Sequence, residues 1–224
     1  MINEKRLVDS FLRYVQIDSE SGQEGEFAAA LQNELKEMGI EARKDEAGNL
    51  FFALNGDESA EPLLFTAHMD TVVPGKGIVP ELKDGLITSG GTTVLGGDDK
   101  SGIAALIEAV RVMREEGIPH RRVEVLFTVE EEIGLNGSRK SDLSQVKSKY
   151  SIALDGCGPM DEIVVNGAGQ ANVQIDIMGV AAHAGNSPEK GVSAVIAAAD
   201  AVSAMKLLKV DEETTANIGT VTAD

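Results

Sequence analysis

The chain has 224 residues, of which 42% are hydrophobic and 25% are charged, a composition typical of a folded globular protein rather than a disordered or fibrous one. This length corresponds to about one and a half average domains and buries enough apolar surface to fold without disulfides or a structural metal. The 37 acidic and 20 basic residues give a net charge of −17, which argues against nucleic acid and anionic membrane surfaces as partners.

Membrane insertion and disulfide bonding are also not expected. No apolar run approaches the roughly 20 residues of a membrane span, and the polar start MINEKR does not resemble a signal peptide. Cys157 is the single cysteine, which excludes an internal disulfide and a cysteine-only zinc site and fits a reducing compartment. We therefore expect a cytoplasmic protein.

Two helices are predicted in the first 40 residues. Apolar residues recur at helical spacing in the first of them: Leu7, Val8, Phe11, Leu12 and Val15. The second is predicted to open at Ser21, because Glu24 three residues later completes a capping-box pattern. Two short strands around Glu41 and Phe51 flank the turn-like stretch DEAGN.

Beyond Pro62 the pattern becomes one of alternating strands and helices. Apolar runs predict buried strands at 63–67, 123–129 and 151–154, with a long helix over 103–117 and a loop carrying a short hairpin over 74–97. This alternation predicts an α/β fold with a mainly parallel sheet flanked by helices.

A domain boundary is predicted near Asn166, which gives an α/β domain over 1–166 and a partial α+β domain over 167–224. In the second domain we expect a strand at 173–177, a helix with Val192, Val195 and Ile196 on its apolar side, and an incipient strand at 217–221. So few elements form a poor independent core.

Acids and a histidine come directly after each predicted parallel strand or at the start of the long helix. These groups are His68-Met69-Asp70, Asp98-Asp99-Lys100, Glu130-Glu131-Glu132 and Asp155. Because the carboxyl ends of parallel strands line one crevice, we expect these side chains to meet there. Carboxylates brought this close protonate or need cations, and Lys100 alone cannot balance them.

Divalent metals balance such a set, and imidazole with carboxylate ligands suits zinc, manganese or cobalt. Two metals about 3.5–4 Å apart that share one carboxylate would use this many acids. Asp70 lies two residues after His68 on an extended chain, so both side chains face the same way and Asp70 can orient the imidazole.

Each group also has an ordinary explanation when it is taken alone. His68 fits an isolated histidine, the glutamates fit a solvated face, the Asp98-Asp99 pair fits a helix N-terminus, and Asp155 fits a turn. A shared metal site in one crevice explains all four groups together, and we therefore favour that interpretation. The sequence has no Gly-x-Ser-x-Gly motif and no complete phosphate-binding loop.

Five stretches of the chain resemble the co-catalytic di-zinc peptidases and amidohydrolases of the aminoacylase/carboxypeptidase type, most closely the peptidase T-like (tripeptidase) branch. The stretches are FTAHMDTV, SGGTTVLGGDDKSGIAA, FTVEEEIGLNGS, ALDG and GVAAHAGNSPEKG. They are spread over most of residues 62–224 and are specific as a combination, although each is weak alone.

The resemblance implies a metal-dependent peptidase with a two-metal centre, most simply zinc. It implies that His68 and Asp155 bind one metal, that Glu132 binds the other, and that Asp98 bridges the two. The substrate would be a short peptide. Removal of acyl groups from amino acids, carboxypeptidase activity and a non-catalytic binding or assembly module remain alternatives.

The same resemblance implies that Glu131 is the general base and that Asp70 orients the metal-binding imidazole. Residues 167–224 would belong to a lid and dimerisation domain, in which His183 reaches the scissile carbonyl oxygen. Members of the family are longer, and their last histidine ligand follows the lid. Neither His120 nor His183 matches that ligand, so we expect a truncated chain whose own activity is in question.

Overall fold

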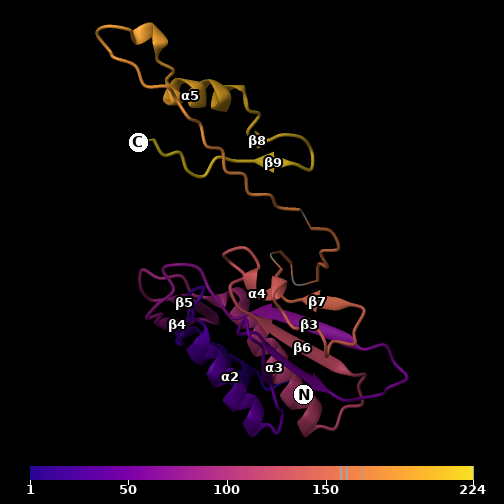
Figure 1. Cartoon of the computed structure of the whole chain (residues 1–224). Helices are drawn as coiled ribbons and strands as arrows, with labels where there is room; N and C mark the ends of the chain where they lie inside the picture. Colours follow the sequence, from indigo (N-terminus) through magenta and orange to yellow (C-terminus); the bar gives the residue numbers. More distant parts are fainter. Residues whose placement is uncertain (157, 160, 168, 224) are drawn as a thin grey trace. The chain divides into compact units, whose positions relative to one another are not determined.

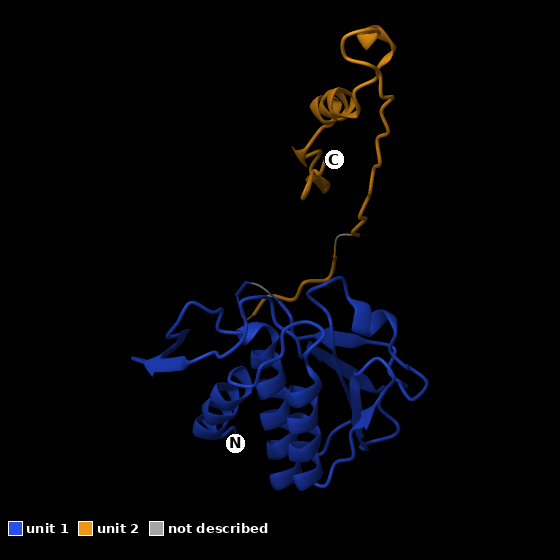
Figure 2. Cartoon of the chain, turned by 60° about the vertical axis from the view of Figure 1, so that its left-hand side comes forward, with its two compact units in different colours: residues 1–159 blue, residues 160–224 orange. Residues whose placement is uncertain are grey.

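The computed structural model describes residues 1–156, 158–159, 161–167 and 169–223. Cys157, which the sequence singled out as the only cysteine, lies outside the described residues. The chain divides into two compact units, Met1–Pro159 and Met160–Asp224, coloured separately in Figure 2. The predicted domain boundary at 166/167 stays a prediction. In the described part of the chain, no helix is long and apolar enough to cross a membrane.

Unit 1 is built on a five-stranded sheet in the order β1-β2-β6-β3-β7 (Figure 1). Its strands are β1 (Arg43–Lys44), β2 (Leu50–Leu54), β3 (Leu63–His68), β6 (Val123–Thr128) and β7 (Ser151–Ala153). β3 runs parallel to both β6 and β7, whereas β2 is antiparallel to β6 and β1 is antiparallel to β2. The predicted α/β class is confirmed, and the three strands that precede the acidic groups are the parallel ones.

Three helices lie side by side along the sheet in unit 1: α1 (Glu4–Val15), α2 (Gly25–Glu37) and α3 (Gly97–Glu115) (Figure 2). Alternate residues of β6 face opposite sides of the sheet. Val125 and Phe127 belong to the main core cluster, in which Phe127 packs edge-on against Phe52 with ring centroids 5.9 Å apart. On the other face, Leu126 packs near Val146 of the segment that precedes β7.

The predicted hairpin within 74–97 is present as β4 (Pro80–Lys83) and β5 (Leu86–Ser89), an antiparallel pair. A short helix α4 (Asn136–Arg139) follows the acidic group after β6. The regular structure in the long connection between β3 and α3 is therefore this one hairpin.

The predicted capping box at Ser21 is wrong. Helix α2 begins at Gly25, and its N-cap residue Glu24 makes no side-chain cap hydrogen bond. The Ser21 hydroxyl donates to Asp70, and the Glu24 carboxylate accepts from the N–H groups of Gly22 and Glu130. Ser21 and Glu24 therefore do not cap the helix through each other, and each has a partner from a distant part of the chain, Asp70 and Glu130 respectively.

Unit 2 contains a 3₁₀ turn η1 (Pro188–Lys190), helix α5 (Ala194–Ala204) and a two-stranded ladder of β8 (Leu208–Lys209) and β9 (Thr215–Ala216). The predicted helix is present with Val195 and Ile196 in it, and the Ser193 side chain caps it by accepting from the N–H of Ile196. Val192, predicted on the same helix, instead lies before it and pairs with Val180 in an isolated β-bridge. The strand predicted at 217–221 is wrong, because the ladder ends at Ala216.

The strand predicted at 173–177 is also wrong, since none of these residues is in a strand. Alternating apolar residues favour a strand, but a strand forms only where a second segment supplies the hydrogen-bonded ladder. Among the described residues of unit 2, the only ladder is that of β8 with β9. The apolar side chains of the stretch, among them Val173 and Ile175, are accordingly exposed.

Candidate metal centre

The candidate centre lies at the carboxyl edge of the three parallel strands. His68 is the last residue of β3, Glu131 and Glu132 follow β6, and Asp155 follows β7. Asp98 comes from the start of α3. The parallel pairing of β3 with β6 and β7 explains the convergence, because it brings all three strand ends to the same edge.

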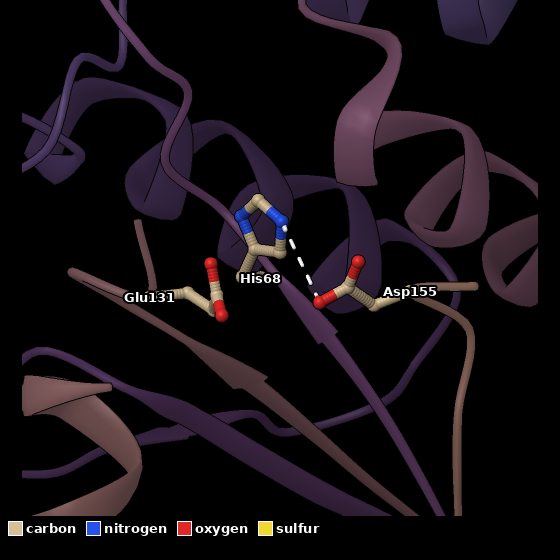
Figure 3. A group of neighbouring side chains, drawn as sticks. All are labelled: His68, Glu131 and Asp155. Carbon is tan, nitrogen blue, oxygen red and sulfur yellow. Dashed lines mark ion pairs between the residues drawn. The ribbon is translucent and has the colours of Figure 1, made fainter. Parts of the chain in front are cut away.

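His68 is the centre of the cluster and is only 2% exposed. Its Nδ1 lies 2.9 Å from the backbone oxygen of Asp70. A carbonyl oxygen only accepts hydrogen bonds, so Nδ1 carries a proton and Nε2 is the atom available to a ligand. Nε2 lies 3.1 Å from Asp98 Oδ1 and 4.0 Å from Asp155 Oδ2. Figure 3 shows the Glu131 and Asp155 carboxylates on either side of the ring.

Two groups of potential ligands share this imidazole. One consists of His68, Glu131 and Asp155, and the other of His68, Asp98 and Glu132. Within each group the ligand atoms lie within 4.8 Å of one another. One nitrogen with several carboxylate oxygens is the donor set that zinc, manganese and cobalt accept in proteins. The residues therefore fit divalent metal ions.

Asp70 serves a different purpose from the other acids. Its side chain is fully buried, and it accepts hydrogen bonds from Glu131 N (2.9 Å), Glu132 N (3.1 Å) and Ser21 Oγ (2.7 Å). Burial alone would raise the pKa of Asp70, but hydrogen bonds from His68, from these two amides and from Ser21 outweigh it and keep the pKa below its ordinary value. Asp70 is thus an anion that holds the acidic loop and the imidazole together.

Three other acids of the cluster have pKa values above those of isolated carboxylates. Burial raises the pKa values of Glu131, Glu132 and Asp155, and the charges of neighbouring carboxylates raise them further, although the charge of His68 acts in the opposite direction. Closely spaced carboxylates that are partly removed from water favour either protons or a cation. A divalent cation among these acids would relieve the same repulsion.

The pKa of His68 rises for the complementary reason. Burial lowers it, but the hydrogen bond and charge of Asp70 and the charges of the other acids outweigh burial and raise the pKa to about 10. Without metal the cluster therefore keeps a proton on the imidazole at neutral pH. A metal that binds Nε2 must displace that proton.

Asp99 and Lys100, the two residues after Asp98, are both buried and belong to neither ligand group. Asp99 is 1% exposed, and among the atoms that the structure describes its Oδ2 has no hydrogen-bond partner. Burial, with smaller influences from Asp155 and Asp98, raises the pKa of Asp99 to about 7. Lys100 is fully buried and donates to the backbone oxygens of Tyr14 (3.1 Å) and Ile17 (2.8 Å), which ties the start of α3 to the end of α1.

The structure thus brings together six of the seven residues that the sequence selected: His68, Asp70, Asp98, Glu131, Glu132 and Asp155. Their individual roles stay predictions. The seventh, His183, lies in unit 2, where its Nδ1 accepts from the N–H groups of Gly185 (3.1 Å) and Asn186 (3.2 Å).

Sequence reasoning missed Ser21 and Glu24 as parts of this region. Their spacing was visible, but its local interpretation as a helix cap hid the long-range contacts to Asp70 and Glu130. It also treated Asp99 only as one of two acids at a helix start. Its burial depends on the bend that Asp98 and Asp99 make there, since both have non-helical φ and ψ angles.

Comparisons with known proteins place the chain in a family and identify similar proteins. The family model described as Peptidase family M28 matches residues 49–206. Over 227 residues the chain is 45% identical to Uncharacterized protein YqjE of Bacillus subtilis strain 168, an alignment that covers 98% of this chain and 61% of that protein.

Two solved structures are also similar to the chain. The aminopeptidase PepT of Bacillus cereus has a TM-score of 0.83 at 43% identity. A tripeptidase of Staphylococcus aureus subsp. aureus Mu50 has a TM-score of 0.82 at 37% identity. Each comparison covers 98% of this chain and 61% of the other. The chain therefore spans about three fifths of the length of these relatives.

Proposed function

Because the chain belongs to peptidase family M28, we propose that it is the metal-binding part of a peptidase that hydrolyses short peptides, with tripeptides as the substrate class. The observation that carries this proposal is the meeting of one imidazole and four carboxylates at a single sheet edge, with Glu131 among them. The similarity to an aminopeptidase and a tripeptidase supports the choice of substrate.

In the proposed arrangement, His68 and Asp155 would bind one metal ion, Glu132 would bind a second, and Asp98 would bridge the two. The two ligand groups support this division, because Asp98 and Glu132 belong to one group and Asp155 to the other. The chemistry that bound divalent ions supply is Lewis acidity at the scissile carbonyl, together with a lowered pKa of the attacking water.

Glu131 is the proposed general base. It takes a proton from the attacking water and delivers it to the leaving amine. Burial raises the pKa of Glu131, which favours proton uptake during the reaction. Asp70 holds the Glu131 amide at 2.9 Å and so fixes the backbone from which this carboxylate extends.

Three finer assignments complete the proposal. Zinc is the proposed metal, because imidazole and carboxylate ligands suit it. Residues 167–224 are proposed to act as a lid and a pairing surface, with His183 at the scissile carbonyl oxygen, which is the typical place for a hydrogen-bond donor that stabilises developing charge. A cytoplasmic location is proposed from the single cysteine.

The test compares Glu131→Gln with Glu130→Gln, since Glu130 is the adjacent acid and belongs to neither ligand group. We expect Glu131→Gln to lower turnover of a tripeptide by about 10²–10⁴-fold, the usual contribution of a general base, with metal content unchanged. Glu130→Gln should retain turnover. Normal turnover in Glu131→Gln would exclude it as the base.

The same assay separates the alternatives. Tripeptides are compared with N-acyl amino acids and with peptides blocked at the amino terminus, each with the zinc-, manganese- and cobalt-loaded protein. Preferential cleavage of N-acyl amino acids, or of blocked peptides at their carboxyl end, would replace the tripeptidase assignment. A full-length parent protein that binds no metal and cleaves none of these substrates would favour a binding module.

A further inference from the structure

The segment formed by residues 18–24 connects α1 to α2, and its side chains reach the loops of the candidate metal centre. Four other residues of the segment hydrogen-bond to the loop that follows β3. Asp18 Oδ1 accepts from Gly77 N (2.8 Å), and Glu20 Oε1 accepts from Gly75 N (2.8 Å). Ser19 Oγ donates to Met69 O (2.8 Å), and Ser21 Oγ donates to Asp70 Oδ2 (2.7 Å). The segment therefore braces the loop that follows β3.

Glu24 extends this bracing to the loop after β6. Its side chain is nearly inaccessible, and Oε1 accepts from Gly22 N (2.8 Å) and from Glu130 N (3.0 Å). Glu130 has a φ of 52°, a left-handed conformation that residues with a side chain rarely adopt. The hydrogen bond to Glu24 acts on the amide of that residue and so supports an unfavourable backbone conformation.

The next two amides of the loop are held in the same manner. Glu131 N donates to Asp70 Oδ1 (2.9 Å) and Glu132 N donates to Asp70 Oδ2 (3.1 Å). Three consecutive N–H groups thus bind two carboxylates. With the backbone fixed at these three points, the side chains of Glu131 and Glu132 enter different ligand groups.

We propose that Glu24 is a positioning residue for the metal centre. By accepting the N–H of Glu130, it fixes the turn that delivers Glu131 to one ligand group and Glu132 to the other. This inference rests on the proposed function, in which those two side chains serve as base and ligand. Glu24 itself contacts neither metal nor substrate and acts through the backbone.

The test uses two variants of similar size, Glu24→Gln and Glu24→Met. Glutamine keeps an oxygen that accepts the two N–H groups, whereas methionine fills the space without such an acceptor. Glu26→Met is the matched control, because Glu26 is exposed in the first turn of the same helix. Amide hydrogen exchange is measured on the metal-free chain, so this part of the test does not depend on activity.

We expect the amides of residues 130–132 to exchange about tenfold faster or more in Glu24→Met, the effect of losing a hydrogen bond to a charged acceptor. In Glu24→Gln and Glu26→Met they should exchange as in the unchanged chain. The amides of Leu31 and Leu35, buried in α2, should be unaffected in all variants. Unchanged exchange at 130–132 in Glu24→Met, or equal acceleration at Leu31 and Leu35, would overturn the proposal.

A second readout is the visible absorption of bound Co²⁺, which responds to the geometry of the ligands. We expect Glu24→Met to alter the band positions and Glu24→Gln to reproduce the spectrum of the unchanged chain. Identical spectra for all variants would show that Glu24 does not act on the metal centre. Failure of the unchanged chain to bind Co²⁺ would reject the proposed function, while the exchange data would still decide the role of Glu24 in the loop.

Discussion

The two units of the chain differ in how they treat their apolar residues. In the described part of the chain, every buried residue lies in unit 1, where Val125 and Phe127 are completely inaccessible. In unit 2, Ile163 is 87% exposed and Val165 is 83% exposed. Unit 1 therefore buries its own core, whereas none of the described apolar side chains of unit 2 is buried.

The potential metal ligands also lie in the unit that has the buried core. The ligand groups draw only on residues of unit 1, from the ends of three neighbouring strands and the start of one helix. A close-packed core holds those ends in place, because packed interiors resist displacement. A precise donor set thus coincides with the unit that buries its own core.

The largest expected effect comes from truncating one apolar side chain in each unit. Phe127→Ala should lower the free energy of unfolding by about 3–5 kcal/mol, because it removes a completely buried ring and leaves a cavity against Phe52. Ile196→Ala should change it by less than about 0.5 kcal/mol, since Ile196 is 64% exposed. Urea denaturation measures both. Equal losses would mean that unit 2 has a core of its own.

A smaller loss is expected from Glu124, a fully buried carboxylate in β6. It accepts from Arg122 Nε (2.8 Å), from the amides of Lys147 and Ser148, and from Ser148 Oγ (2.6 Å). These contacts fix the segment that leads into β7 and on to Asp155. Glu124→Ala leaves the donors unpaired and should cost about 3 kcal/mol of unfolding free energy.

The control for this prediction is Ser148→Ala, which removes one donor and leaves the carboxylate with its other partners. It should cost about 1 kcal/mol. A loss in Glu124→Ala no greater than in Ser148→Ala would show that the carboxylate does not hold this segment. The same urea experiment measures both variants.

The third prediction concerns pH and is confined to the metal-free protein. His68 has its pKa raised to about 10 and Asp99 to about 7. A group with a raised folded-state pKa binds its proton more tightly when folded, so it stabilises the fold at low pH and this stabilisation is lost as pH rises. Burial lowers the pKa of Lys100 to about 8. The free energy of unfolding therefore rises with pH through Lys100, but only above about pH 8.

Between pH 6 and 8 the free energy of unfolding should therefore fall by about 2 kcal/mol through His68 alone. Urea denaturation in the presence of a chelator measures this. Replacement of the imidazole in His68→Asn should remove the His68 part of this dependence and leave the part that Asp99 contributes. A metal-free protein whose stability rises over this interval would contradict the account of the cluster as a proton-holding site.

The sequence predicts unit 1 better than unit 2, and the reason is physical. Buried strands and amphipathic helices leave periodic patterns, so β3, β6 and α3 are predictable from local residues. That His68 and Asp155 lie close together follows from one further rule: the carboxyl ends of parallel strands lie at the same edge of the sheet. Val173 and Ile175 carry an equally clear alternation, yet they form no strand, because pairing depends on a partner that the pattern cannot supply.

The hydrogen bonds that support the site cannot be predicted from local sequence patterns. Ser21 and Glu24 have the spacing of a helix cap, but their partners are about 50 and 100 residues away along the chain. The burial of Asp99 likewise depends on backbone angles at the start of α3. Long-range hydrogen bonds of this kind follow from the assembled fold and not from local periodicity.

The most direct measurement of the central claim is a calorimetric titration of Zn²⁺ into the metal-free chain, with His68→Ala and His120→Ala as a matched pair. His68 belongs to both ligand groups and His120 to neither. We predict saturable binding by the unchanged chain and by His120→Ala, and an affinity at least about 100-fold lower in His68→Ala, since changes beyond the ligands alone cost 10–100-fold. Equal affinity in all three proteins, or no binding by the unchanged chain, would contradict the claim that these strand ends form a metal centre.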